Sequence, residues 1–266
     1  MQLDLLIGYF FCYAVIGYIL EVLYCSFFEK RLVNRGFLHG PYLPIYGFGS
    51  LIIILLFQNH SVHPMLVFIL TFLLTSLLEY VTSFLLERLF NAKLWDYSTY
   101  PFNLHGRVCL LNSTLFGLLG LLVIYGIHPF VFSLMHALDP RLIDTMSTAI
   151  VVVISIDTTS SVFRMAAFQK QLGEFRKKAQ EIEDRMALLS KLTTNKPLEQ
   201  LKLRLDEERD ELRLRLESAS RRILDAFPSI TSVNEEKRLQ FETLKQHAKE
   251  WRQRRKAFLR RHTRRD

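Results

Sequence analysis

Cysteine is scarce in this sequence, and the few cysteines form no chemical motif. The chain has 266 residues and 3 cysteines, Cys12, Cys25 and Cys109, each in or beside an apolar run. Their number is odd, and no CxxC pair or Cys/His cluster occurs. A disulfide framework and a zinc site are therefore excluded as the basis of the fold, and we expect neither a metal nor a cofactor.

Two further signatures are missing from the sequence. The motif GxxxxGK[ST], whose backbone amides bind nucleotide phosphates, does not occur, so the sequence contains no P-loop ATPase. The N-terminal segment MQLDLLIGYF has no positive charge before its apolar run, and no small-residue cleavage site follows that run. We therefore expect the first apolar run to be a retained helix and not a signal peptide.

Basic residues are rare in the first three-fifths of the chain, and this divides the sequence in two. Of the 34 Lys and Arg, 7 lie before residue 164 and 27 lie from residue 164 onward, so the net charge is −2 in the first part and +10 in the second. The apolar residues, 50% of the chain, are concentrated in the first part. The division predicts a membrane domain over 1–163 and a basic helical tail over 164–266.

The apolar runs predict an all-α fold, a polytopic membrane helix bundle. A span needs about 20 mostly apolar residues. Four runs meet this length, and a shorter run at 43–57, entered through two prolines, either crosses the membrane or is re-entrant. Together they predict about five transmembrane helices, with the four longer spans at 3–28, 64–86, 108–127 and 143–163.

The basic residues between the spans predict the orientation of the bundle. The loops after the first and third spans each contain three Lys or Arg, whereas the loop after the second has none and the loop after the fourth has only Arg141. Loops rich in Lys and Arg remain in the cytoplasm. We therefore expect a multi-pass membrane protein with its N-terminus outside and its tail in the cytoplasm, and the family resemblance described below implies that this membrane is the bacterial plasma membrane.

Two stretches of the membrane domain resemble each other. Glu21 is followed eight residues later by Glu29, and Glu79 is followed eight residues later by Glu87. Each pair precedes a loop that contains Leu-His-Gly, at 38–40 and at 104–106. The pattern predicts an internal duplication of two helical hairpins, 3–57 and 64–127, and transporters commonly place substrate sites between such repeats.

Three carboxylates lie within the apolar runs or at their cytoplasmic ends, namely Glu21, Glu79 and Asp157. A carboxylate inside the bilayer costs several kcal/mol unless it is paired, protonated or hydrated. Such residues therefore line a polar pathway or form a structural network near the membrane surface, and the sequence leaves both readings open.

The two cytoplasmic loops are too rich in Gly and Pro to be helical and too apolar to be solvated linkers. We expect them to fold back onto the bundle as conformational or partner-binding loops. His39 and His105 with their polar neighbours could form a catalytic cluster, but their spacing matches no metal or nucleophile signature, so we favour a structural role and no enzyme activity. The candidate loop residues are Asn34, Arg35, Gly36, His39, Gly40, Pro41, Trp95, Asp96, Asn103, His105 and Gly106.

The runs NRGFLHGPYLPIYGFG and WDYSTYPFNLHGRVCLLNS, with Glu21 and Glu79 upstream of them, resemble the bacterial family of ABC-transporter permeases of the CmpB type. The resemblance covers about residues 5 to 165. It implies a permease subunit whose ATPase is a separate polypeptide, and it implies no particular substrate or catalytic residue. Permease domains of this kind usually have more than five spans, so the resemblance also implies a dimer.

The tail shows coiled-coil spacing of apolar residues from Phe175 to Leu189 and again from Leu198 to Ile223, and a third helix is expected after Asn234. We expect a homo-oligomer or a coiled-coil partner through 172–226. Nine Lys and Arg within 249–265 suit anionic lipid headgroups. Nucleic acid is not expected, because no base-reading module accompanies this charge.

Three functions are compatible with these observations. A transport subunit that works with a separate ATPase is the first, and it depends on the carboxylates, the repeat and the family resemblance. A membrane-anchored scaffold or sensor that recruits partners through its coiled-coil tail is the alternative. A membrane enzyme using His39 and His105 ranks last.

Overall fold

The computed structural model confirms the predicted all-α membrane bundle. It describes residues 2–30, 33–57 and 62–190, and beyond these only single residues and short runs between 201 and 246. Four of the described helices are long and apolar enough to cross a membrane. They cover Leu3–Phe27, Pro64–Phe90, Leu110–Ala137 and Pro140–Leu189.

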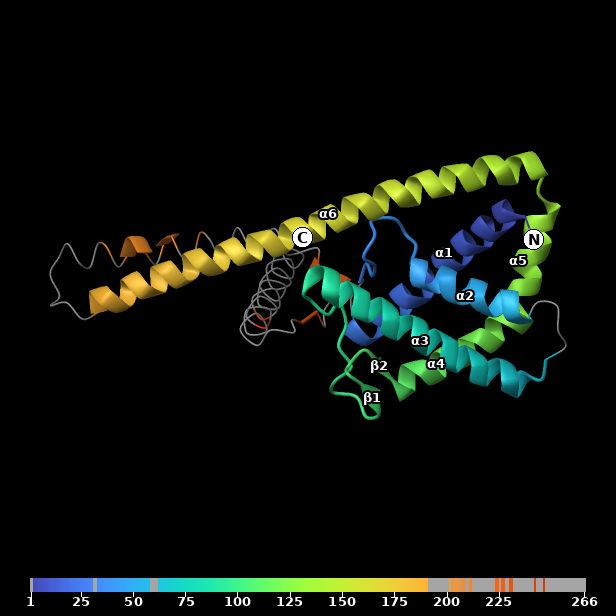
Figure 1. Cartoon of the computed structure of the whole chain (residues 1–266), viewed down its shortest axis with the longest axis horizontal. Helices are drawn as coiled ribbons and strands as arrows, with labels where there is room; N and C mark the ends of the chain where they lie inside the picture. Colours follow the sequence, from blue (N-terminus) through green and yellow to red (C-terminus); the bar gives the residue numbers. More distant parts are fainter. Residues whose placement is uncertain are drawn as a thin grey trace, which may run out of the picture. The chain divides into compact units, whose positions relative to one another are not determined.

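The first two long helices are similar in length and in how they end. Helix α1 (Leu3–Glu29) and helix α3 (Pro64–Phe90) each have 27 residues, about 40 Å at 1.5 Å per residue, which is enough to cross a bilayer. Each is followed by a residue with left-handed backbone, Lys30 at φ 49° and Asn91 at φ 49°. Each then pairs with the next helix of the chain to form a hairpin (Figure 1).

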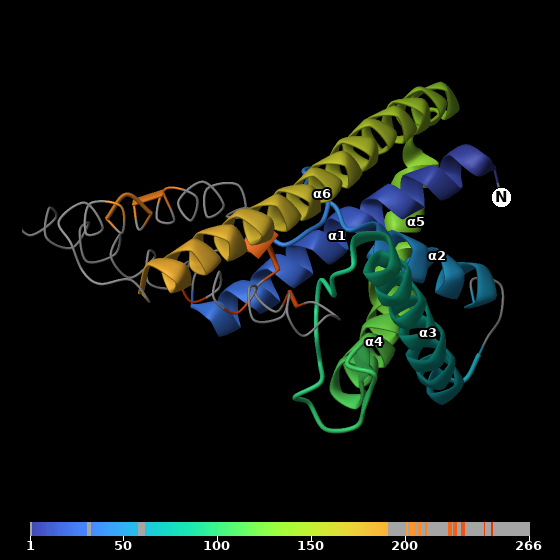
Figure 2. The ribbon, with the colours of Figure 1, turned by 60° about the vertical axis from the view of Figure 1, so that its left-hand side comes forward.

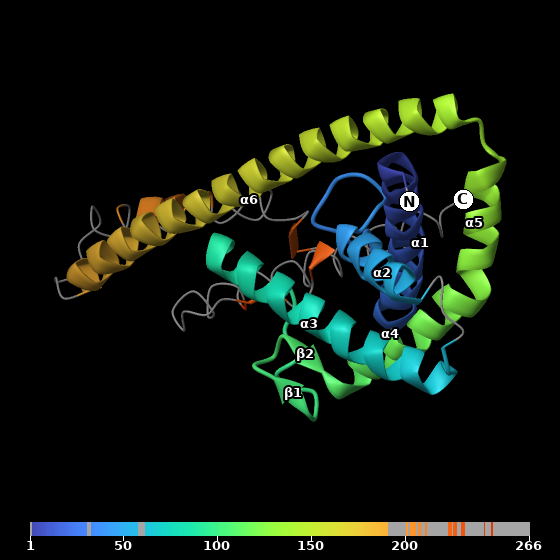
Figure 3. The ribbon, with the colours of Figure 1, turned by 45° about the vertical axis from the view of Figure 1, so that its right-hand side comes forward.

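The predicted span at 108–127 is longer than expected. Helix α4 (Leu110–Leu122), the π-helical turn η1 (Val123–Ile127) and helix α5 (His128–Ala137) follow one another without a break. The segment 128–137, which lies beyond the predicted span, therefore continues α4. Its direction changes at η1 (Figures 1 and 3), which fits the frequent occurrence of bends at π-helical turns.

The last long helix, α6 (Pro140–Ser190), runs through residue 163 without interruption. It has 51 residues, about 77 Å, far more than a bilayer requires. The first predicted tail helix, from Phe175 to Leu189, is therefore the end of α6. The later coiled-coil stretches and the helix after Asn234 lie outside the described residues except for single positions, and the basic cluster at 249–265 lies wholly outside them.

Helix α2 (Pro44–Phe57) has only 14 residues, about 21 Å, so it is too short to cross the bilayer alone. Its beginning is fixed halfway along α1, because the backbone N–H of Leu43 donates to the Ala14 carbonyl at 2.9 Å. α1 and α6 run in the same direction, with the Ser147 hydroxyl donating to Asp4 at 2.9 Å and Ile154 packed beside Ala14 (Figure 2).

These contacts fix the depth of the loop at 33–43, which joins α1 to α2. Ala14 and Asp157 each lie ten residues beyond the contact between Asp4 and Ser147, which is about 15 Å along a helix. The loop is therefore fixed between α1 and α6, about 15 Å along both helices from that contact. Irregular backbone within a membrane bundle is tolerated only where protein buries it or where it lines a cavity.

The core of the bundle lies between α1, α2 and the segment from α4 to α5. Tyr9 and Tyr13 of α1 are fully buried against Ile53 and Ile54 of α2. The Tyr13 hydroxyl also lies 3.0 Å from Nδ1 of the buried His128. A polar pair therefore sits inside an otherwise apolar core and fixes α5 against α1.

Close packing of α1 on α2 depends on glycine. A Cβ added at Gly47 would lie 2.7 Å from the Phe10 carbonyl oxygen and 2.7 Å from its ring, so a larger residue would push the two helices apart. A Cβ added at Gly49, two residues further along α2, would meet nothing closer than 3.7 Å.

We predict that Gly47→Ala lowers the stability of the bundle by about 1–3 kcal/mol, which is the usual cost of overpacking. Gly49→Ala is the matched control in the same helix and should leave stability nearly unchanged. Thermal unfolding of the purified protein in mild detergent measures both variants. Equal Tm values for the two would show that α1 and α2 do not pack as described.

Candidate functional site

Glu21, in the second half of α1, is fully engaged by its neighbours. The Tyr46 hydroxyl donates to its Oε2 at 2.5 Å, and Arg35 Nε lies 3.3 Å from its Oε1. The Cys25 thiol donates to the same Oε1 at 3.6 Å. Arg35 comes from the loop and Tyr46 from α2, so Glu21 ties the first hairpin together.

Glu79, in α3, is buried but only partly engaged. Its side chain is 5% exposed, and the Tyr97 hydroxyl donates to its Oε1 at 3.3 Å. Its Oε2 is buried and has no hydrogen-bond partner among the described residues. An unsatisfied oxygen of this kind is costly inside a protein and requires a physical explanation.

The two glutamates belong to one electrostatic cluster. Burial raises the pKa of the Tyr97 phenol well above its ordinary value, the charges of Glu79 and Glu21 raise it further, and Arg35 lowers it. Tyr97 is therefore a neutral hydrogen-bond donor that feels both carboxylates and the arginine. The structure thus brings together Glu21, Glu79 and Arg35, three residues that the sequence singled out.

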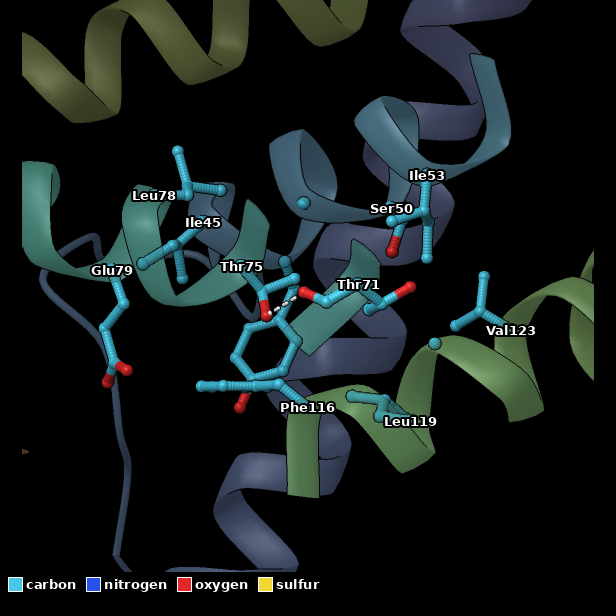
Figure 4. Close-up of a pocket in the computed structure, with 13 residues that line it drawn as sticks. Ile45, Ser50, Ile53, Thr71, Thr75, Leu78, Glu79, Phe116, Leu119 and Val123 are labelled. Carbon is cyan, nitrogen blue, oxygen red and sulfur yellow. Dashed lines mark hydrogen bonds between the residues drawn. The ribbon is translucent and has the colours of Figure 1, made fainter. Parts of the chain in front are cut away.

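A pocket adjoins this cluster between α2, α3 and α4. In Figure 4, Glu79 lies at one end of it and Val123 at the other, with Phe116 and Thr71 between them. Its volume of about 50 Å³ compares with roughly 10–15 Å³ needed for one water molecule. The Oγ1 of Thr71, another residue of the lining, is also buried without a hydrogen-bond partner among the described residues.

Asp157, the third predicted carboxylate, lies in a different cluster and has many partners. The backbone N–H groups of His39 and Gly40 donate to it at 2.9 and 2.8 Å, and the Tyr42 hydroxyl donates at 2.7 Å. The His39 ring Nδ1 is 2.8 Å away, and the Ser161 hydroxyl donates at 3.2 Å. Asp157 therefore fixes the first loop to α6, and we call this arrangement the Asp157 clasp.

The second loop contains a short antiparallel hairpin of β1 (Asn103–Leu104) and β2 (Val108–Cys109). His105 at φ 54° and Gly106 at φ 70° form its turn, closed by the Arg107 N–H donating to the Leu104 carbonyl at 3.0 Å. Positive φ at both central residues is typical of a type I′ turn. The two Leu-His-Gly tripeptides therefore have different structures. The first donates backbone hydrogen bonds to the Asp157 carboxylate, and the second forms the turn of the hairpin.

The polar residues of the second loop hold the hairpin in place. Asn103 accepts from the Gly106 N–H at 3.0 Å, and the Trp95 indole donates to the Arg107 carbonyl at 3.1 Å. Asp96 accepts from the Ser98 N–H at 3.0 Å. The Arg107 guanidinium donates to Glu87 at 2.8 Å and thereby fixes the hairpin to α3.

His39 and His105 do not form a shared catalytic cluster. His39 binds Asp157, whereas His105 Nδ1 lies 3.2 Å from the Tyr80 hydroxyl. In the part of the chain that the structure describes, no group of three His, Cys, Asp or Glu could hold a metal. Of the remaining candidates, Asn34 accepts from Tyr18 at 2.8 Å, Gly36 adopts φ 144°, and Pro41 lies in the loop next to the clasp.

A family model matches residues 8–162 of this chain, more than half of its length. The chain belongs to the family described as Putative ABC-transporter type IV. The match includes Glu21, Glu79, Asp157 and both loops. No curated protein and no solved structure matches the chain.

Membership in this ABC-transporter family agrees with the four helices that are long and apolar enough to span a membrane, and together they indicate a multi-pass membrane protein.

The residues that complete the site were not found from the sequence. Tyr46 and Tyr97 stand at unrelated distances from their glutamates, and Thr71 is one threonine among many apolar neighbours. The sequence also did not indicate that Asp157 contacts residues 39–42, because more than a hundred residues separate them.

We predict that Asp157→Asn lowers the free energy of unfolding by about 2 kcal/mol, because hydrogen bonds to a charged acceptor contribute roughly 1.5–3 kcal/mol each. Asp144→Asn, at an exposed position of the same helix, is the control and should have little effect. Thermal unfolding in detergent distinguishes them. If both variants unfold at the same temperature, the Asp157 clasp does not hold the loop.

Proposed function

We propose that this protein is the membrane subunit of an ABC-type transporter, with the pocket beside Glu79 as part of its transport path and the ATPase on a separate polypeptide. The observation that carries the proposal is Glu79 itself, buried in the helix bundle, lining a pocket, and with no hydrogen-bond partner for its Oε2 among the described residues. Acidic residues placed in this way inside membrane proteins usually serve ion or substrate pathways.

A purely structural role explains Glu79 less well. A structural polar network stabilises a protein when all its members are satisfied, and it is worse than an apolar core when they are not. In the Asp157 clasp both carboxylate oxygens accept hydrogen bonds, although Nε2 of His39 is buried without a partner among the described residues. The Glu79 carboxylate accepts one hydrogen bond, from Tyr97, and its Oε2 has no partner among the described residues. This arrangement suits a group that binds an ion or a substrate during transport.

The short helix α2 supports the same proposal. Transporters commonly build their sites near the middle of the membrane from helices that are interrupted there. α2 begins near the middle of α1, and Ile45, Tyr46, Gly49, Ser50 and Ile53 from its first three turns line the pocket. The duplication of the α1–α2 and α3–α4 hairpins, which we also propose, would place this pocket between the two repeats.

No P-loop occurs in this sequence, and we assign ATP hydrolysis to a partner polypeptide. The cytoplasmic loops and the end of α6 are the surfaces we assign to that partner. The predicted orientation, with the N-terminus outside, places them on the side where ATP is available.

The length of α6 supports a second candidate function. The helix extends far beyond the thickness of a bilayer, and Arg164, Lys170 and Glu174 follow its apolar part. A charged helical extension suits a scaffold that recruits cytoplasmic proteins or forms a coiled coil. In that case the bundle serves as an anchor and Glu79 has no role in function.

The first test is purification of the native complex in mild detergent followed by mass spectrometry. We expect an ABC-type ATPase in fixed stoichiometry with this chain. If the chain is isolated alone, or with unrelated partners lost on truncation after Lys170, the transporter proposal fails and the scaffold is favoured.

A second prediction concerns Glu79 itself. In vesicles containing the purified complex, Glu79→Gln should reduce ATP hydrolysis coupled to transport to the background level, while the ATPase stays bound. Asp144→Asn, which neutralises a carboxylate outside the pocket, should hydrolyse ATP at the rate of the unmodified complex. Normal activity of Glu79→Gln would remove Glu79 from the mechanism.

A further inference from the structure

The chemistry of the pocket indicates what it binds. We propose that it takes a small organic monocation with an apolar body, such as a protonated alkyl or aryl amine, whose charge is held by Glu79. The inference depends on the proposed function, because it names the class of substrate for the same pocket.

The charge of the ligand follows from the missing partner of Glu79. Arg35 and Arg107 are each paired with another glutamate, Arg35 with Glu21 at 3.3 Å and Arg107 with Glu87 at 2.8 Å. No ion pair links Glu79 to any other residue that the structure describes, and its Oε2 lacks even a hydrogen bond. A carboxylate in this setting needs a cation or a proton from outside the protein, and an anionic ligand would meet two glutamates.

The walls of the pocket determine the body of the ligand. Apolar side chains dominate the lining, and Phe116 offers an aromatic face to a cation. Glu79 and Thr71 are eight residues apart on α3, about 12 Å, so the charged group of the ligand binds at one end while its apolar part lies along the helix. The apolar lining residues are Ile45, Ile53, Leu78, Phe116, Leu119 and Val123.

Other ligand classes fit less well. A sugar needs many hydrogen-bonding groups, and the lining offers few beyond Glu79, Thr71, Ser50 and Thr75. A calcium ion takes 6–8 oxygen ligands, and magnesium requires near-octahedral coordination. Thr75 is in addition already engaged, because its hydroxyl donates to the Thr71 carbonyl at 2.7 Å.

The test measures binding by the purified full-length protein, independently of any ATPase. The probes are butylammonium, hexylammonium and benzylammonium, each compared with its neutral alcohol. A ligand that binds the folded state raises the Tm in proportion to the logarithm of its concentration above Kd. We expect at least one ammonium probe to raise the Tm and to bind more tightly than its alcohol.

Variants locate the binding to this pocket. Glu79→Gln should weaken binding of the ammonium probe by roughly thirtyfold or more, as expected for removal of one partner of a buried charge pair. Gly49→Phe should abolish binding by filling the pocket, whereas Gly49→Ala, whose added Cβ meets nothing closer than 3.7 Å, should retain it. Because Gly49→Phe keeps Glu79 intact, the test does not depend on one variant alone.

Several results would overturn the inference. The inference is wrong if an ammonium probe and its alcohol bind equally, or if Glu79→Gln binds the ammonium probe as tightly as the unmodified protein does. It is also wrong if no ammonium probe binds, and Glu79 is then a proton site only. If an ATPase co-purifies and no ammonium probe binds, the substrate class is wrong and the transporter proposal stands. If ammonium binding depends on Glu79 and no ATPase co-purifies, the ligand assignment stands and the transporter proposal is wrong.

Discussion

The Asp157 carboxylate accepts hydrogen bonds from two backbone amides and from Tyr42, and the arrangement of the first hairpin depends on it. These bonds satisfy backbone groups that would otherwise be unpaired inside the helix bundle, at a cost in free energy. The loop then ends at Leu43, which is bonded to Ala14, and α2 begins there. This position directs Tyr46 to Glu21 and places the first three turns of α2 along the pocket.

Asp157 and Glu79 show two outcomes for a carboxylate among apolar helices. Asp157 has donors on both oxygens and stabilises a loop, and its role needs no ligand. Glu79 has one donor, an orphaned oxygen and a pocket beside it. Natural proteins retain costly groups of the second kind mainly at functional sites, where stability is lost in exchange for activity.

The sequence predicted the bundle because long apolar runs in a membrane protein allow few structures other than helices. It also selected Glu21 and Glu79 through their matching positions in the two hairpins. It did not predict that Leu-His-Gly would bind a carboxylate in one loop and form a turn in the other, because the aspartate bound by the first tripeptide is more than a hundred residues away. Tyr97, the partner of Glu79, precedes the second Leu-His-Gly, whereas Tyr46, the partner of Glu21, follows the first. The partners of the two glutamates therefore do not occupy equivalent positions in the repeat.

The central claim is that Glu79 is kept for function and not for the stability of the bundle. The most direct measurement is the Tm of Glu79→Gln and Glu79→Leu in mild detergent, compared with that of the unmodified protein. If the claim holds, Tm is unchanged or raised in both, because each removes a buried carboxylate with an unsatisfied oxygen. A clear fall in Tm for both variants would contradict it and would make Glu79 part of a structural network.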